Sequence, residues 1–180
     1  MDKKVIGLVG EIASGKGTVS AYLQEKYAGK IYRFSDVLRA ILEVLHLECK
    51  RENLSNLSLS LRETFGENIL SNALVKSVLK DENSLIILDG IRRKEELDFL
   101  GEIDGFKLVY VESDMRSRYE RIIERGENAD DNTKTFEAFK RDHEMDAELR
   151  IKEMKELADI VIENSGALEE LYEKADTLVE

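Results

Sequence analysis

The sequence predicts an α/β domain in three layers, with helices on both sides of a parallel sheet. Short apolar runs alternate along the chain with longer segments of helical periodicity, and strands that are separated by helices pair in parallel through right-handed crossovers. The 180 residues include no proline, and we find neither an internal repeat nor a linker-like stretch. We therefore expect residues 1–180 to fold as one domain, because a chain of this length can bury a single hydrophobic core efficiently.

Five strands are expected where apolar residues run together. The first run, residues 4–9, is apolar on both faces, which is typical of a buried parallel strand. The other runs lie at 31–34, 85–88, 106–111 and 160–162. Helical patterns fill the intervals, at about 18–27, 36–48, 57–80, 94–100, 114–125, 134–157 and 167–178.

The net charge of -11, from 38 acidic and 27 basic side chains, limits the choice of partner. Polymeric nucleic acid and anionic membrane surfaces both attract positively charged proteins, so this composition disfavours both. Residues 126–180 hold much of the acidity, with 17 acidic and 7 basic side chains. A small anionic ligand is therefore expected to bind upstream of residue 126.

The single cysteine, Cys49, excludes an internal disulfide framework and a clustered thiolate site for zinc or iron–sulfur. We find no signal-peptide pattern and no apolar stretch of membrane-spanning length. These features predict a soluble cytoplasmic protein, and they do not indicate its oligomeric state.

The most informative segment is residues 10–18, GEIASGKGT, which follows the first strand and opens a helix. The spacing Gly-x4-Gly-Lys in this context is that of a phosphate-binding loop, or P-loop. Backbone N–H groups of such a loop point at phosphate oxygens, and the helix adds its positive dipole end. Lys16 would reach the β- and γ-phosphates. The alternative is a glycine-rich turn with an exposed lysine. The expected ATP-binding residues of the loop are Gly10, Ala13, Ser14, Gly15, Lys16, Gly17 and Thr18.

One position departs from the strict motif. Gly17 occupies the place of the Ser or Thr that binds Mg²⁺, and the hydroxyl comes one residue later, at Thr18. This Gly-Lys-Gly-Thr ending resembles that of adenylate kinases and related small-molecule kinases more than that of GTPases. The sequence also has no Asn-Lys-x-Asp motif for reading guanine.

The second predicted strand is followed by Ser35-Asp36-Val-Leu-Arg39. This segment resembles the Thr-Gly-Asp-x-Leu-Arg segment by which adenylate kinases hold the acceptor monophosphate, although Phe34 and Ser35 replace the Thr-Gly pair. The resemblance implies that Ser35, Asp36 and Arg39 bind the acceptor. The alternative is a helix cap at Ser35 or Asp36 beside a solvated Arg39.

The third predicted strand leads into Asp89-Gly90-Ile-Arg92. A carboxylate at this end of a strand is suited to organising Mg²⁺, directly or through water, or to acting as a base toward the acceptor. Gly90 permits close approach of a substrate, and Arg92 lies within reach of the same place. We assign Gly90, Arg92 and Arg62 to the acceptor side. A plain turn with a solvated arginine pair is the alternative.

Arg118, Arg121 and Arg125 are spaced to share one helix face. Arg121 and Arg125, followed by a polar loop, resemble the start of the mobile lid of nucleotide kinases, and Arg141 would lie on its returning side. The resemblance implies that these arginines close over the phosphates and stabilise the transition state. The alternative is a solvated face paired with Glu120 and Glu124.

Near the end of the chain, Asn164-Ser-Gly166 resembles the closing segment of dephospho-CoA kinases and of predicted archaeal nucleotide kinases. In those proteins this loop lies beside the adenine, which would place Asn164 and Gly166 at the ATP site. A simple turn with Gly166 in a left-handed conformation explains the same residues.

These segments together resemble the superfamily of P-loop nucleoside monophosphate kinases. The resemblance implies a five-stranded parallel sheet in the order 2-3-1-4-5, an acceptor-binding helical insert at about 35–80 and a lid at about 121–142. It also implies ATP as phosphoryl donor, Mg²⁺ bound near Thr18 and Asp89, and a nucleoside or deoxynucleoside monophosphate as acceptor. Dephospho-CoA kinase is one alternative, and a regulatory protein that hydrolyses nucleotide slowly or not at all is another. The implied catalytic residues are Lys16, Asp89, Arg121 and Arg125.

Overall fold

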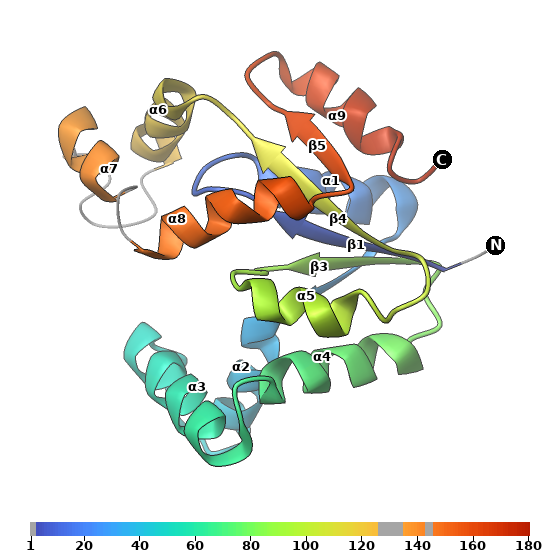
Figure 1. The fold of residues 1–180 in the computed structure, drawn as a ribbon, viewed down its shortest axis with the longest axis vertical. Coiled ribbons are helices and arrows are strands. Elements are labelled where there is room, and N and C mark those ends of the chain that lie inside the picture. The colour runs from blue at the N-terminus through green and yellow to red at the C-terminus, as the bar shows by residue number, and fades with distance from the viewer. Residues whose placement is uncertain (1–2, 126–134, 143–145) are drawn as a thin grey trace.

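A five-stranded parallel sheet runs through the middle of the protein in the computed structural model, which describes residues 3–125, 135–142 and 146–180 (Figure 1). The strands lie in the order β2-β3-β1-β4-β5, and every pairing is parallel. The order implied by the family resemblance is therefore confirmed. The strand bounds are β1 (Lys4–Val9), β2 (Lys30–Arg33), β3 (Leu85–Asp89), β4 (Phe106–Glu112) and β5 (Ile160–Glu163).

The first strand takes the central place because its side chains are apolar on both faces. Val5, Leu8 and Val9 are fully buried, and β1 pairs with β3 on one side and β4 on the other. The run of residues at 4–9 thus forms the buried strand that its composition predicts. The loop that leaves this strand consequently lies in the middle of the sheet edge, between the neighbouring strands.

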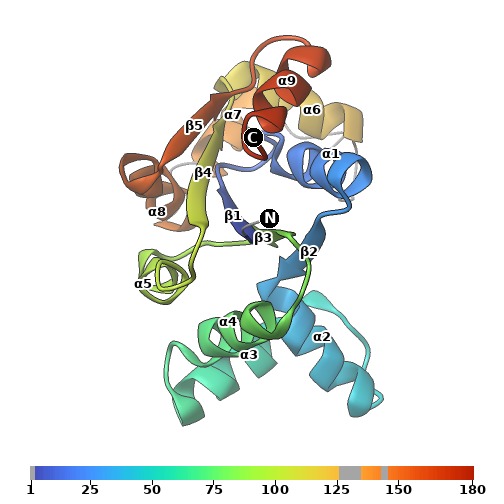
Figure 2. The ribbon, with the colours of Figure 1, turned by 90° about the vertical axis from the view of Figure 1, so that its right-hand side faces the viewer.

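Helices cover both faces of the sheet and complete three layers (Figure 2). On one face, α1 and α9 pack over a core that includes Val19, Leu23 and Leu171. On the other face, α2, α4 and α5 pack over a second core together with the chain around Met154. Among the described residues, no helix is long and apolar enough to cross a membrane. The helix bounds on these faces are α1 (Lys16–Tyr27), α2 (Phe34–Val44), α4 (Ile69–Lys80), α5 (Lys94–Leu100) and α9 (Leu168–Asp176).

The connection between β2 and β3 is a helical insert whose helices lie together below the sheet in Figure 2. It contains α2, α3 (Arg51–Phe65) and α4. The single helix expected at 57–80 is two helices, because α3 ends at Gly66, whose φ of 97° is left-handed and favours glycine. The chain can turn there, and α3 packs against both α2 and α4.

The second long helix expected, at 134–157, does not reach its predicted end as an α-helix, because a 3-10 turn begins at Met154. The described parts are α7 (Phe136–Asp142), α8 (Asp146–Glu153) and a 3-10 turn, η2 (Met154–Leu157). The preceding helix, α6 (Met115–Arg125), falls where its periodicity predicts.

Asp81 holds the amino end of the sheet together. Its carboxylate accepts hydrogen bonds from Lys30 Nζ at 2.5 Å, from the Tyr32 hydroxyl at 2.6 Å and from the Asn83 backbone N–H at 2.8 Å. These donors, Lys30 foremost, hold the pKa of the Asp81 carboxyl well below its usual range. The side chain is nearly buried.

We expect Asp81→Asn to lower the free energy of unfolding at pH 7. Because the folded-state pKa is depressed, this contribution is complete above the unfolded-state pKa of about 4 and is lost as the pH falls through the folded-state value. Urea denaturation of parent and variant from pH 7 downward should show a difference that narrows below about pH 4. Asp98→Asn, at an exposed site on α5, is the matched control. A difference that stays constant over the whole range would contradict this role.

Candidate functional site

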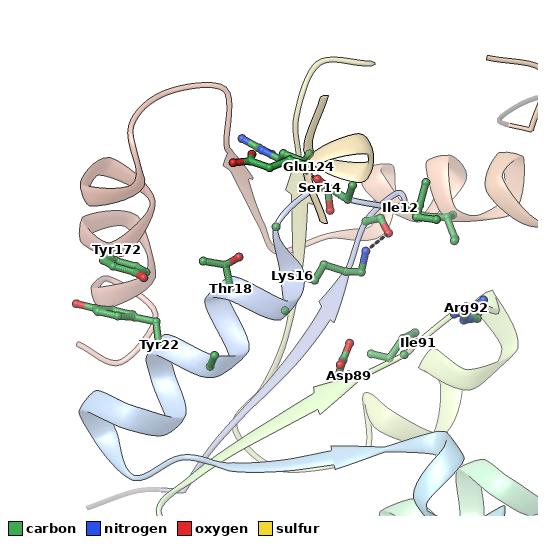
Figure 3. Close-up of a pocket in the computed structure, with 18 of the residues that line it drawn as sticks. Ile12, Ser14, Lys16, Thr18, Tyr22, Asp89, Ile91, Arg92, Glu124 and Tyr172 are labelled. Carbon is green, nitrogen blue, oxygen red and sulfur yellow. Dashed lines mark hydrogen bonds between the residues drawn. The ribbon is translucent and has the colours of Figure 1, made fainter. Parts of the chain in front are cut away.

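The phosphate-loop pocket is a cavity of about 1080 Å³ at the carboxyl ends of β1 and β3 (Figure 3). The P-loop, which connects β1 to α1, forms one wall of this pocket. Eight residues of the predicted P-loop segment 10–18 line it: Gly10, Ile12, Ala13, Ser14, Gly15, Lys16, Gly17 and Thr18. The lining also includes Ala21, Tyr22, Glu25, Asp89, Gly90, Ile91, Arg92, Arg121, Glu124, Ile151 and Tyr172.

The P-loop leads into α1 at Gly15. Gly15 is the N-cap of that helix with φ 107°, and no side chain caps the helix. The first-turn N–H groups of a helix have no partner within the helix, so they are available to an anion in the pocket. A Cβ on Gly15 would lie 2.2 Å from Asn164 Nδ2, so only glycine fits here.

Lys16 lies over the loop rather than extending into solvent. Its ammonium group donates to the carbonyl oxygens of Gly10 at 2.6 Å and Glu11 at 2.8 Å. Figure 3 shows the side chain beside the loop, with Thr18 two residues further along the helix. The cation is therefore held at the mouth of the loop, where phosphates would meet it.

Two residues from later in the chain support the loop from behind. Asn164 is buried, and its side-chain amide donates to the Ser14 carbonyl oxygen at 2.8 Å. Arg121 donates to the Asn164 carbonyl oxygen at 2.9 Å, to the Ser113 hydroxyl at 3.1 Å and to the Ala13 carbonyl oxygen at 3.4 Å. These contacts fix the loop against α6 and the end of β5.

Of the three residues predicted to contact ATP from the later part of the chain, only one lies at the pocket. Arg121 lines the phosphate-loop pocket, whereas Asn164 and Gly166 do not, and Gly166 is exposed. Asn164 is close to the P-loop but faces its rear. Its contact with a nucleotide remains a prediction, as does that of Gly166.

The acceptor-side pocket is a second cavity, of about 660 Å³, that opens from the same end of β3. Of the predicted acceptor residues, Ser35, Arg62, Gly90 and Arg92 line it. Its other lining residues are Arg33, Phe34, Leu38, Leu54, Ser55, Ser58, Leu59, Leu70, Asp89, Arg93 and Glu96.

Asp36 and Arg39 do not line either pocket. The Asp36 carboxylate accepts the backbone N–H of Arg33 at 2.9 Å. Arg33 is the N-cap of α2, so Asp36 stabilises the start of the helix from its first turn, whereas the alternative interpretation expected the cap itself at Ser35 or Asp36. Arg39 is exposed one turn beyond Ser35, and its contact with the acceptor remains a prediction.

The two pockets share Asp89, Gly90 and Arg92. Figure 3 shows the Asp89 carboxylate directed into the phosphate-loop pocket on the side that faces Lys16. Its Oδ2 lies 3.4 Å from Arg33 Nε. A ligand on the loop and a ligand in the acceptor-side pocket would therefore meet beside Asp89.

Glu96 organises the arginines of the acceptor-side pocket. Its carboxylate accepts the backbone N–H groups of Arg92 at 3.0 Å and Arg93 at 3.3 Å, and Arg62 lies 3.6 Å away. Burial raises the pKa of the Glu96 carboxyl, while the hydrogen bonds from Arg92 and Arg93 oppose that rise. Arg62 also donates to the Glu67 carbonyl oxygen at 2.6 Å. The Arg92 side chain, in contrast, makes no hydrogen bond or ion pair with the described residues.

The far end of the phosphate-loop pocket contains an aromatic pair that the sequence did not reveal. The rings of Tyr22 and Tyr172 stack with centroids 4.1 Å apart and an interplanar angle of 6° (Figure 3). Tyr22 lies one turn after Thr18 on the same helix. Helical spacing from Thr18 could therefore have placed Tyr22 at the pocket. Tyr172 comes from α9 and carried no comparable signal.

The middle of the predicted lid, at about 121–142, falls outside the described residues. Residues 126–134 and the side chain of Arg125 lie there. Arg141 is on α7, exposed, and lines neither pocket. The lid roles of Arg125 and Arg141 remain predictions.

The phosphate-loop pocket offers few protein ligands for Mg²⁺, so most ligands of the ion would be phosphate oxygens and waters. Among the described residues, no three His, Cys, Asp or Glu side chains gather into a metal site. Thr18 and Asp89 both line the pocket and offer a hydroxyl and a carboxylate oxygen. Mg²⁺ prefers oxygen ligands and usually keeps several waters beside one or two carboxylates and substrate phosphates.

A parallel sheet of this order, with a P-loop after its central strand, defines the class of P-loop kinase-like proteins. The chain belongs to the UPF0200 family, and a family model described as an AAA domain matches residues 9–139. A UPF0200 protein of Sulfurisphaera tokodaii is 33% identical over 178 residues, which cover 98% of this chain and 96% of the relative.

Solved structures show the same fold at low sequence identity. TT1252 from Thermus thermophilus has a TM-score of 0.62 at 18% identity and covers 99% of this chain and 97% of its own. Dephospho-CoA kinase from Campylobacter jejuni has 0.59 at 16%, covering 98% and 96%. APS kinase from Mycobacterium tuberculosis, in complex with AMPPNP and APS, has 0.58 at 18%, covering 99% and 98%.

Proposed function

We propose that this protein is an ATP-dependent kinase that transfers the γ-phosphoryl group to a nucleoside or deoxynucleoside monophosphate. One observation carries the proposal: the phosphate-loop pocket and the arginine-lined acceptor-side pocket meet at Asp89, Gly90 and Arg92. Phosphoryl transfer depends mainly on placing donor and acceptor in line and on neutralising charge between them. Two adjoining pockets of this kind meet that requirement, whereas a nucleotide switch needs only one.

On the donor side, the loop N–H groups and Lys16 would bind the ATP phosphates, and Arg121 would add a second cation at the edge of the same pocket. Thr18 and Asp89 would hold Mg²⁺ through its waters or directly. The ion would supply positive charge against the phosphate oxygens. Lys16 lies over the loop, with its ammonium group at two loop carbonyl oxygens, and it lines the pocket that would take the phosphates.

On the acceptor side, the pocket combines cations with an apolar wall. Four arginines line it against two carboxylates, so the lining favours an anion. Phe34, Leu38 and Leu54 provide surface for a flat base. Arg62 is oriented by Glu96 and Glu67, while Arg92 stands at the junction of the two pockets, where the transferred group would pass.

The decisive experiment is a coupled ADP-release assay with ATP, Mg²⁺ and each nucleoside and deoxynucleoside monophosphate in turn, with dephospho-CoA as a further acceptor. We expect turnover that depends on one or a few monophosphates. Turnover with dephospho-CoA alone would replace the proposal with dephospho-CoA kinase. ATP binding with no acceptor-dependent release would favour a regulatory nucleotide-binding protein instead.

Arg62→Gln tests the acceptor-side pocket separately from the phosphate-loop pocket. We expect the KM for the acceptor to rise about 10- to 100-fold, the usual effect of losing a hydrogen bond to a charged group, with the KM for ATP nearly unchanged. Lys76→Gln, on an exposed position of α4, is the matched control. Equal rises in both KM values would remove Arg62 from the acceptor site.

A further inference from the structure

The P-loop contains a buried carboxylate, Glu11, on the side away from the phosphate-loop pocket. Glu11 is only 7% exposed and does not line the cavity. A negative charge within a loop that binds an anion works against binding unless another group neutralises it. We propose that Arg118 is a positioning residue that neutralises Glu11 and so allows the loop to accept a polyphosphate. This inference rests on the proposed function, since it concerns the ATP side of that site.

The contacts of Arg118 support this role. Its guanidinium lies 3.1 Å from Glu11 Oε1 and is only 2% exposed. The same group donates to the Ser113 carbonyl oxygen at 3.1 Å and to the Ile12 carbonyl oxygen at 3.4 Å. Its central carbon also lies 5.8 Å from the ring centre of Phe139. Arg118, which lies on α6, thus contacts both the Glu11 carboxylate and the backbone of the P-loop.

A second cation, Lys152, also lies near Glu11, and its contribution to neutralising the carboxylate can be compared with that of Arg118. Lys152 Nζ, on α8, lies 3.8 Å from the same Glu11 oxygen, but its side chain is half exposed. Solvent weakens such an exposed pair, whereas the buried Arg118 pair is screened much less. The neutralisation therefore depends mainly on Arg118, and Lys152 contributes a smaller part.

The buried position of the pair also excludes a lid role for Arg118. Its predicted neighbours on the helix face, Arg121 and Arg125, are separated from it by one and two turns. Arg118 instead faces inward, beneath the loop, where it donates to the carbonyl oxygens of Ser113 and Ile12 and to the Glu11 carboxylate. It cannot reach a ligand in the cavity without abandoning Glu11.

The test is a double-mutant cycle read out as binding of ATP and ADP by calorimetry. Arg118→Met leaves the Glu11 charge uncompensated, and we expect the Kd for ATP to rise about 10- to 30-fold, with a smaller rise for the less charged ADP. Adding Glu11→Gln to that variant removes the charge again, and the Kd for ATP should return to within about threefold of the parent. Arg116→Met, on the exposed side of α6, is the matched control.

Two further variants keep the inference testable should Arg118→Met fail to fold. Glu11→Gln alone leaves Arg118 uncompensated, so ATP should bind more tightly than to the parent. Lys152→Met should weaken ATP binding by about two- to fivefold, as expected for an exposed pair, and adding Glu11→Gln should cancel that loss. Thermal unfolding of each variant separates loss of stability from loss of affinity.

The outcomes distinguish this inference from the proposed function. A parent protein that binds neither ATP nor inorganic tripolyphosphate would overturn both. A parent that binds ATP, with Arg118→Met binding it equally well, would overturn only the role of Arg118. A double variant as weak as Arg118→Met would show that packing, and not charge, explains the loss. Glu11→Gln binding ATP no more tightly than the parent would also contradict the charge argument.

Discussion

Lys16→Met is expected to lower kcat by about 10²- to 10³-fold, the usual effect of removing one group that stabilises transition-state charge. Lys16 is the P-loop cation, and its ammonium group already lies over the loop at the carbonyl oxygens of Gly10 and Glu11. Methionine has a similar length and no charge, so the fold should survive. The measurement is the ADP-release rate with the best acceptor at saturating ATP.

The matched control for this variant is Lys76→Met, on an exposed position of α4 away from both pockets. Thermal unfolding of both variants should match that of the parent within a few degrees. An unaffected kcat in Lys16→Met, with normal folding, would remove the P-loop from the chemistry.

Asp89→Asn is expected to have the second largest effect, a fall in kcat of about 10²-fold. The substitution keeps the shape of the side chain but removes the charge at the junction of the two pockets, where Mg²⁺ and the transferring group would meet. The Mg²⁺ concentration for half-maximal rate should also rise. Rate against Mg²⁺ concentration, at fixed ATP and acceptor, measures both effects.

Asp98→Asn, exposed on α5, controls for the general loss of a negative charge in this part of the chain. A fall in kcat with an unchanged Mg²⁺ dependence would separate Asp89 from the metal and leave it a role toward the acceptor. A parent-like rate would place the chemistry elsewhere.

The fold and the P-loop could be predicted because their signals are local in sequence. The apolar run of β1, the Gly-x4-Gly-Lys spacing and the following helix lie within residues 4–27, and they fold where their composition requires. The sheet order came from the family resemblance, not from periodicity. The prediction of one helix at 57–80 was wrong because the apolar spacing continues through the turn at Gly66. Only the left-handed φ of Gly66 shows that the chain turns there.

The supporting contacts of the site could not be predicted because they join distant parts of the chain. Glu11 and Arg118 are 107 residues apart, and Ser14 and Asn164 are 150 residues apart. One chemical signal was available: a glutamate inside an anion-binding loop requires compensation. Arg118 was instead grouped with Arg121 by helical spacing, which shows that two residues share a face but not which neighbour covers each of them.

The hydrogen bond from Asn164 to the P-loop has a consequence for the order in which the protein matures. The loop is synthesised 150 residues before the amide that fixes it, which directly follows β5. Pairings of such high sequence separation form late, because the intervening chain must first be ordered. Capacity to bind nucleotide should therefore arise only after Asn164 has been synthesised, and a nascent chain stalled before residue 160 should not be retained on immobilised ATP.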